Sequence, residues 1–183
     1  MAITLTIETG AVVAGANTFI SLANFKAYLT NRARSFTTYT DDQLSAALIR
    51  AGQYLNGLNW MGRKTGRTNP MCWPRESDGD YPESFASGQE ITGGVIDRNG
   101  YEIEINEVPQ EAIDAQCEGA WLEVQGTSLQ PSLERGGAVQ SEKVDMIQTT
   151  YFSGAPGITR HMAIESLLAG LLRSTLSIET TRA

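Results

Sequence analysis

The chain has 183 residues, of which 41% are hydrophobic and 19% are charged. A globular chain of this length can bury about 70% of its unfolded surface, and this composition excludes an intrinsically disordered protein, a collagen and a long coiled coil. The formal net charge is −7. This charge argues against a protein that coats nucleic acid over its whole surface, because phosphate binding requires a basic surface.

The charges are distributed very unevenly along the chain. Residues 26–75 hold eight bases and two acids, a net charge of +6, whereas residues 76–145 hold sixteen acids and three bases, a net charge of −13. Such a chain can neutralise itself internally and present a solvated surface of mixed patches. Alternatively, it can present a basic face and an acidic face to neighbouring copies, and head-to-tail contacts of that kind can close into a ring. Both alternatives are open at this point.

The first half of the chain predicts a strand followed by two helices. Alternating apolar and polar residues at 3–8 predict a strand, with a turn at 8–10 and a second strand at 11–13. Ser21 is placed to cap a helix. Thr40 and Gln43 form a capping box at the start of a second, clearer helix. The apolar faces of these helices comprise Leu22, Phe25, Leu29 and Ala33 in the first, and Leu44, Ala47, Leu48, Ala51, Leu55 and Leu58 in the second.

The second half predicts a hairpin and two more helices. An Asn-Gly step between β-forming runs predicts a hairpin at 95–105, and Pro109 fits the first turn of a third helix that Gly126 ends. Residues 144–152 are rich in β-formers, and an apolar face formed by Ile164, Leu167, Leu168 and Leu171 predicts a last helix at about 159–172. The apolar face of the third helix comprises Ile113, Cys117, Ala120, Trp121 and Val124.

These elements predict a mainly α fold with small β additions, a bundle of about four helices with β-hairpins and long loops or arms. We expect a single domain at 1–183. Its parts are an N-terminal strand or arm at 1–20, a helical core at 21–126 with a long loop at 59–94 and the hairpin at 95–105, a strand region at 139–152, a closing helix at 158–173 and a polar tail at 174–183.

The sequence carries no pattern that is typical of an enzyme. Nucleotide-binding, zinc-protease and serine-hydrolase motifs are absent, and His161 is the only histidine. Glu102 and Glu104 would share one face of a strand, but such a pair is more often a wet strand edge than an acid-base site. We therefore expect no catalytic residues, no cofactor and no metal. We also expect no signal peptide, no membrane contact and synthesis in a reducing cytoplasm.

The segment that stands out lies between Trp60 and Arg75. Aromatic residues beside cations can stack on bases and neutralise phosphates, as in single-strand binders. In the other interpretation, which we favour for the tryptophans, they anchor the segment to the helical body while the cations bind local carbonyls or acids. For Arg63, Lys64 and Arg67 both interpretations remain open. The candidate subunit-interface or DNA-contacting residues are Arg63, Lys64, Arg67, Trp73 and Arg75.

Several short segments follow one another in a specific order along nearly the whole chain. They are 15–23, Tyr28, 51–56, the Trp-x-Gly-Arg at 60–63, the Trp-Pro-Arg at 73–75, the Val-Pro at 108–109, the Ser-Glu-Lys-Val at 141–144 and the Thr-Tyr at 150–151. Their order resembles the head-to-tail connector, or adaptor, proteins of tailed bacteriophages, whose sequences often carry the description of a DnaT-like single-stranded-DNA-binding protein.

The resemblance implies a structural protein of the virion that is assembled in the host cytoplasm. It would form a ring, commonly of twelve subunits, beneath the portal protein at the head-tail interface, where it would also meet tail-completion or second adaptor proteins. Duplex DNA would pass through the ring without sequence-specific binding, since an acidic lumen does not hold phosphate. The best candidates for exposed acidic surface are 76–90 and 100–107. The candidate portal-contacting tail residues are Arg173, Ile178 and Arg182.

The family description also names the alternative function, a single-stranded-DNA-binding replication protein of the primosomal, DnaT-like kind. That function predicts salt-sensitive binding of oligonucleotides that is lost when Arg63, Lys64 and Arg67 are replaced by alanine.

Overall fold

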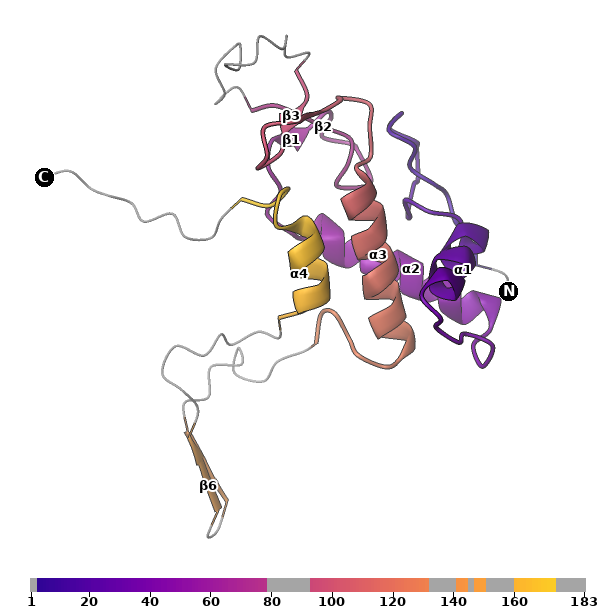
Figure 1. Cartoon of the computed structure of the whole chain (residues 1–183), viewed down its shortest axis with the longest axis vertical. Coiled ribbons are helices and arrows are strands. Elements are labelled where there is room, and N and C mark those ends of the chain that lie inside the picture. Colours follow the sequence, from indigo (N-terminus) through magenta and orange to yellow (C-terminus); the bar gives the residue numbers. More distant parts are fainter. Residues whose placement is uncertain (1–2, 79–92, 132–140, 145–146, 151–159, 174–183) are drawn as a thin grey trace, which may run out of the picture.

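The structure is a computed structural model that describes residues 3–78, 93–131, 141–144, 147–150 and 160–173. Within these ranges it is mainly helical with small β additions, which confirms the predicted fold class (Figure 1). The helices are α1 (Leu22–Asn31), α2 (Asp41–Asn56), α3 (Gln110–Val124) and α4 (Met162–Leu168). The strands form antiparallel pairs, β1 (Arg63–Lys64) with β2 (Arg75–Glu76), β3 (Val95–Ile96) with β4 (Glu102–Ile103), and β5 (Ser141–Val144) with β6 (Ile147–Thr150).

The first two helices begin where their capping residues predict. The Ser21 hydroxyl accepts the N–H of Asn24 at 3.2 Å, and Thr40 and Gln43 exchange side chain to backbone bonds of 2.8 and 3.2 Å. Helix α1 is shorter than its apolar pattern suggests, because Ala33 has a φ of +52° and lies beyond the last turn. The predicted face of α2 is confirmed from Leu44 to Leu55.

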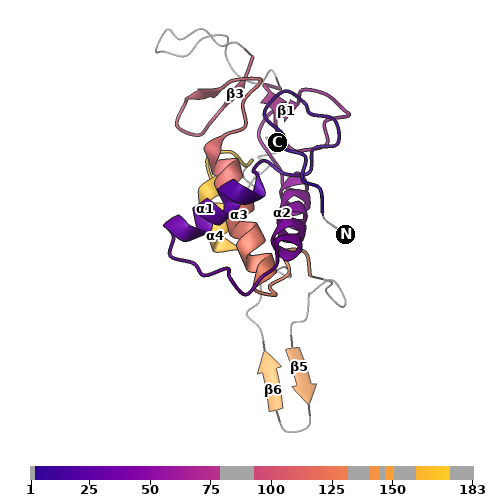
Figure 2. The ribbon, with the colours of Figure 1, turned by 90° about the vertical axis from the view of Figure 1, so that its right-hand side faces the viewer.

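Helix α3 is central, since it packs against both α2 and α4 (Figure 2). Its buried face differs from the predicted stripe of bulky residues, and Ile113 and Trp121 are only half-buried. Small residues let the helices approach closely: a Cβ on Gly119 would lie 3.2 Å from the Cβ of Ala51. The buried residues of α3 are Ala112, Ala115, Gln116, Cys117, Gly119 and Ala120.

The N-terminal strands predicted at 3–8 and 11–13 are wrong. The segment makes a single isolated bridge between Ile7 and Thr18 and is otherwise irregular. Its shape is set by Glu8, which is buried and whose carboxylate accepts the N–H groups of Gly10, Val12 and Val13 at 2.8–3.0 Å. A carboxylate that satisfies three backbone donors favours a tight local turn over a strand ladder.

The hairpin predicted at 95–105 is confirmed as β3 and β4, with Gly100 in its turn at a φ of +87°. It lies with the β1–β2 hairpin at one end of the helical body (Figure 1). The predicted closing helix is shorter than expected, since α4 ends at Leu168 and a turn follows. Strands β5 and β6 confirm β structure within 139–152. Residues 79–92 of the long loop, and the tail with Ile178 and Arg182, lie outside the described residues.

None of the four helices that the structure describes has the length and apolarity that a bilayer crossing requires.

Candidate nucleic-acid interface

The cationic loop, defined here as residues 63–67 with the sequence Arg-Lys-Thr-Gly-Arg, begins in β1 and leads towards β2. Residues 59–75, which contain it, hold four cations and no acid. Its position in the fold is fixed by the residues at its base.

Two tryptophans anchor the base of the loop to the helical body. Trp60 and Trp73 are 3% and 0% exposed. The indole N–H of Trp60 donates to the carbonyl of Leu55, in the last turn of α2, at 2.7 Å. Neither ring is therefore available to stack on a base, and the anchoring interpretation is confirmed for both tryptophans.

Arg75 stabilises the base of the loop through hydrogen bonds to backbone carbonyls. Its guanidinium is largely buried and donates to the carbonyls of Met61, Gly62 and Cys72 at 2.6–3.1 Å. Burial lowers the pKa of this guanidinium. Because its donors are directed at backbone carbonyls inside the protein, Arg75 is not placed to contact a phosphate.

A second set of bonds fixes the turn that carries the cations. The Lys64 ammonium donates to the carbonyl of Asn69 at 3.2 Å. Asn69 is buried, its amide N–H₂ donates to the Thr65 hydroxyl at 2.8 Å and its backbone N–H donates to the carbonyl of Gly66 at 3.2 Å. The loop therefore has a defined shape before any ligand binds.

The two arginines of the loop face solvent. The Arg63 side chain is 68% exposed and pairs with Glu76, with 2.8 Å between Nε and Oε1. Exposed pairs of this kind contribute little stability, so a phosphate can take the place of the carboxylate. Arg67 is exposed and forms no ion pair with any residue in the described part of the chain. The loop thus presents three cations, of which one is paired with an acid.

Elsewhere in the described residues, cations of the basic segment 26–75 pair with acids. Lys26 binds Asp41 at 2.6 Å within that segment. Arg34 binds Glu118 at 2.9 Å and Arg50 binds Glu123 at 2.6 Å, and these two pairs join the basic segment to the acidic segment 76–145. The charge segregation is therefore partly neutralised inside one chain, as the first of the two alternatives proposed.

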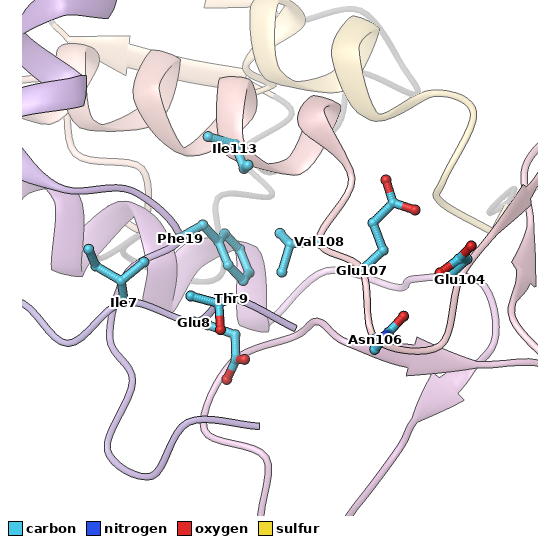
Figure 3. Close-up of a pocket in the computed structure, with 9 residues that line it drawn as sticks. All are labelled: Ile7, Glu8, Thr9, Phe19, Glu104, Asn106, Glu107, Val108 and Ile113. Atoms are coloured by element: carbon cyan, nitrogen blue, oxygen red, sulfur yellow. The ribbon is translucent and has the colours of Figure 1, made fainter. Parts of the chain in front are cut away.

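A groove between the N-terminal segment and the start of α3 is lined by acids, whereas the cationic loop carries bases (Figure 3). Phe19, Val108 and Ile113 give it an apolar wall, and the exposed carboxylates of Glu104 and Glu107 lie at its other side. These acids repel phosphate, so the groove is unsuited to DNA. They confirm exposed acidic surface within 100–107.

The remaining candidates also have defined places. Arg173, predicted in the tail, donates to the carbonyl of Trp60 at 3.2 Å and forms an ion pair with Asp78, so it lies beside the loop base.

His161 is buried, and its ring packs edge to face against the ring of Tyr54, with 5.9 Å between the ring centroids. Glu102 accepts the N–H of Gly94 at 2.9 Å and helps to hold its hairpin. No group of three potential metal ligands occurs among the described residues.

Two exposed side chains at this end were missed by the sequence analysis. Arg98 and Tyr101 lie on the β3–β4 hairpin, and Tyr101 is 69% exposed. The sequence pattern placed Tyr101 in the β-forming run after the Asn-Gly step and gave no indication of its exposure. The signal that was available is the position of Tyr101 directly after an Asn-Gly turn, where a strand has no neighbour to cover its side chains.

Fold and loop together define a small helical protein with a preformed cationic loop on a buried tryptophan base. A family model described as "Putative DnaT-like ssDNA binding protein" matches residues 3–183, and the chain belongs to this family. No curated protein and no solved structure matches it.

The head-to-tail connector function that the sequence resemblance implied is wrong by this comparison. The description of the family agrees with the alternative, single-strand binding, and names no portal, ring or virion. The partners expected from the connector function, identical subunits in a ring, the portal protein and other tail proteins, therefore lose their support.

Proposed function

We propose that this protein binds single-stranded DNA and that the cationic loop holds the phosphates. The observation that carries the proposal is the acid-free, solvent-facing loop with Arg63, Lys64 and Arg67 on a braced base. The family to which the chain belongs supports the same ligand by its description. We also propose that the chain acts by binding and has no catalytic activity of its own.

Each cation has a way to reach a phosphate. Arg63 exchanges the carboxylate of Glu76 for a phosphate oxygen, and Arg67 has no ion pair to break within the described residues. Lys64 donates one of its three protons to Asn69 and keeps two for the ligand. Because the turn is already ordered, binding costs little conformational entropy.

The acidic remainder of the chain limits DNA to this end of the molecule. With a net charge of −7, surfaces away from the loop repel phosphate, the groove with Glu104 and Glu107 among them. Binding through three phosphate contacts predicts a slope of log K against log salt of about −2, since each contact on a single strand contributes about −0.7. Affinity should then fall about 20-fold between 50 and 200 mM salt.

The test measures anisotropy of a fluorescein-labelled oligothymidine of about 20 nucleotides at 50 mM salt, a length that covers the usual site sizes of single-strand binders. The loop variant is Arg63→Ala, Lys64→Ala and Arg67→Ala. The matched control is Lys26→Ala, Arg50→Ala and Arg160→Ala, which removes the same charge from residues that are each paired with an acid. Melting curves check that both variants fold.

We expect the loop variant to lose binding and the salt slope to approach zero, while the control variant keeps most of its affinity. Equal losses in the two variants would mean that net charge alone governs binding. No binding by the wild-type chain at 20 mM salt would overturn the proposed function itself.

A further inference from the structure

The β3–β4 hairpin is joined directly to the base of the cationic loop. The N–H of Ser77, just after β2, donates to the carbonyl of Gly93 at 2.8 Å. The backbone of Gly62 lies so close to Val95 that a Cβ there would be 2.6 Å from its side chain. The two hairpins are therefore in direct contact, and Figures 1 and 2 show both at the same end of the molecule.

The backbone that carries Tyr101 is held rigidly. The Asp97 carboxylate accepts the N–H groups of Asn99 and Tyr101 at 2.9 and 2.8 Å, and the N–H of Asp97 donates to the carbonyl of Tyr101 at 2.8 Å. Two residues further on, in β4, Ile103 packs against the core. Tyr101 instead leaves 69% of its side chain in water, the largest exposed fraction among the large hydrophobic side chains of the described residues.

Two arginines lie on the segments that join the hairpin of Tyr101 to the loop base. Arg98 is exposed, and its backbone N–H donates to the carbonyl of Gly170 at 3.0 Å, which ties the hairpin turn to the end of α4. Arg173, three residues further on, is 45% exposed and bonds to the carbonyl of Trp60 at the loop base. A chain of backbone contacts thus runs from the loop base through 170–173 to the turn that bears Arg98 and Tyr101.

We propose that Tyr101 is a stacking platform for a base of the single strand whose phosphates the cationic loop holds, with Arg98 contacting the next part of the backbone. This inference rests on the proposed function. Single-strand sites combine a cationic track with aromatic faces, because phosphate contacts position the strand and stacking holds its bases. Both tryptophans near the loop are buried, so Tyr101 supplies the exposed aromatic face that such a site requires.

The direction of the strand follows from the charges at this end. Arg98 lies in the turn before Tyr101, where the Asp97 carboxylate already accepts the N–H groups of Asn99 and Tyr101, whereas the exposed Glu104 and Glu107 follow β4. A phosphate backbone avoids the two exposed carboxylates, so the strand leaves the loop over the Arg98 turn. Stacking accepts any base, so the site should show little preference among base sequences.

The experiment compares Tyr101→Ala with Tyr101→Phe, and binds each to oligothymidine and to an abasic oligonucleotide of the same length and charge. Met162→Ala is the matched control, because Met162 is 66% exposed and lies at the start of α4. We expect Tyr101→Ala to weaken oligothymidine binding about 5- to 150-fold, the measured range for one stacked base. Tyr101→Phe, Met162→Ala and every variant on the abasic strand should stay within twofold of the wild type.

A second measurement uses an oligonucleotide with 5-iododeoxyuridine, which cross-links to aromatic side chains under ultraviolet light. The expected cross-link falls on Tyr101. Unchanged affinity of Tyr101→Ala for oligothymidine would overturn the inference while leaving the proposed function standing, provided that the loop variant loses binding. Absence of any DNA binding by the wild type would instead remove the proposed function and the inference together.

Discussion

The buried guanidinium of Arg75 donates to the carbonyl of Gly62 at 2.6 Å, directly beneath the first residue of the cationic loop. Gly62 has a φ of +64°, and a Cβ there would lie 2.4 Å from the carbonyl oxygen of Glu76. A glycine is therefore required at this point for the backbone to turn towards the guanidinium. Of the four cations in residues 59–75, Arg75 is thus an internal brace, Arg63 and Arg67 face solvent, and Lys64 is half-buried.

This division of roles predicts opposite effects of two arginine substitutions. Arg75→Met keeps the side-chain volume but leaves three backbone carbonyls without their donors, so the free energy of unfolding should fall by about 3 kcal/mol or more. Arg67→Met removes an exposed charge and should change stability by less than about 0.5 kcal/mol. Urea denaturation measures both values.

In DNA binding the order of the two variants should be reversed, with the larger effect expected for Arg67→Met. At a temperature where both are folded, Arg67→Met should reduce the salt slope by about 0.7, the contribution of one phosphate on a single strand. An Arg75→Met protein as stable as the wild type would contradict the role of Arg75 as the brace.

Features set by neighbouring residues were predicted well from the sequence. The capping box of Thr40 and Gln43, the cap at Ser21 and the Asn99-Gly100 turn all form as expected, because each depends on bonds within a few residues. The anchoring of Trp60 and Trp73 was also the favoured interpretation, since large aromatic residues contribute most when buried.

Features set by distant contacts were not predictable. The buried Gln116 accepts the N–H of Phe19 at 2.8 Å and donates to the carbonyl of Leu48 at 2.9 Å, so α3 turns this polar residue inwards. No local pattern indicates a glutamine in the core, because its partners lie far away in the chain. The exposure of Tyr101 depends in the same way on where the layer that covers the hairpin ends, whereas alternation predicts only which side of a strand a residue takes.

Two glycines with positive φ should respond very differently to alanine. At Gly15 the φ is +72° and a Cβ would meet nothing within 4 Å, so Gly15→Ala should cost about 1–2 kcal/mol, the intrinsic penalty of the left-handed region. At Gly10 the φ is +99° and a Cβ would lie 1.8 Å from the carbonyl oxygen of Asn106. Gly10→Ala should therefore destabilise at least twice as much in urea denaturation.

The close approach of Gly10 to Asn106 also predicts how Gly10→Ala changes the local dynamics of the N-terminal segment. Moving the backbone at Gly10 separates the N-terminal segment from residues 106–107, so amide exchange should quicken at Val12 and Val13, whose N–H groups are bonded to Glu8. Equal destabilisation by the two alanines would show that the segments do not pack as closely as described.

The two cysteines predict a loss of stability at alkaline pH. Burial raises the pKa of the Cys72 thiol to about 12 and also raises the pKa of the Cys117 thiol. In the unfolded chain a thiol ionises near pH 8.5. Between these values the unfolded state releases a proton that the folded state keeps, so rising pH favours unfolding.

The size of the effect follows from the same difference in proton binding. The free energy of unfolding should be insensitive to these groups below about pH 8 and should then fall by about 1.4 kcal/mol per pH unit for each thiol. Burial raises the pKa of Tyr28 as well, which adds a term of the same sign above about pH 10. Urea denaturation at intervals between pH 7 and 9.5 isolates the thiols from this tyrosine.

The matched variant is Cys72→Ala with Cys117→Ala. It removes both thiols, and the lost packing lowers the free energy of unfolding by about the same amount at every pH. Its stability should therefore be lower than that of the wild type at pH 7 but nearly constant up to pH 9.5. The wild-type thiols should also react with a thiol reagent at pH 8 only as fast as the chain unfolds, because the reactive thiolate forms outside the core. If either thiol in the folded wild type reacted as fast as free cysteine, the packing around α3 and the tryptophan base would be open to solvent, and the rigid support proposed for the cationic loop would be lost with it.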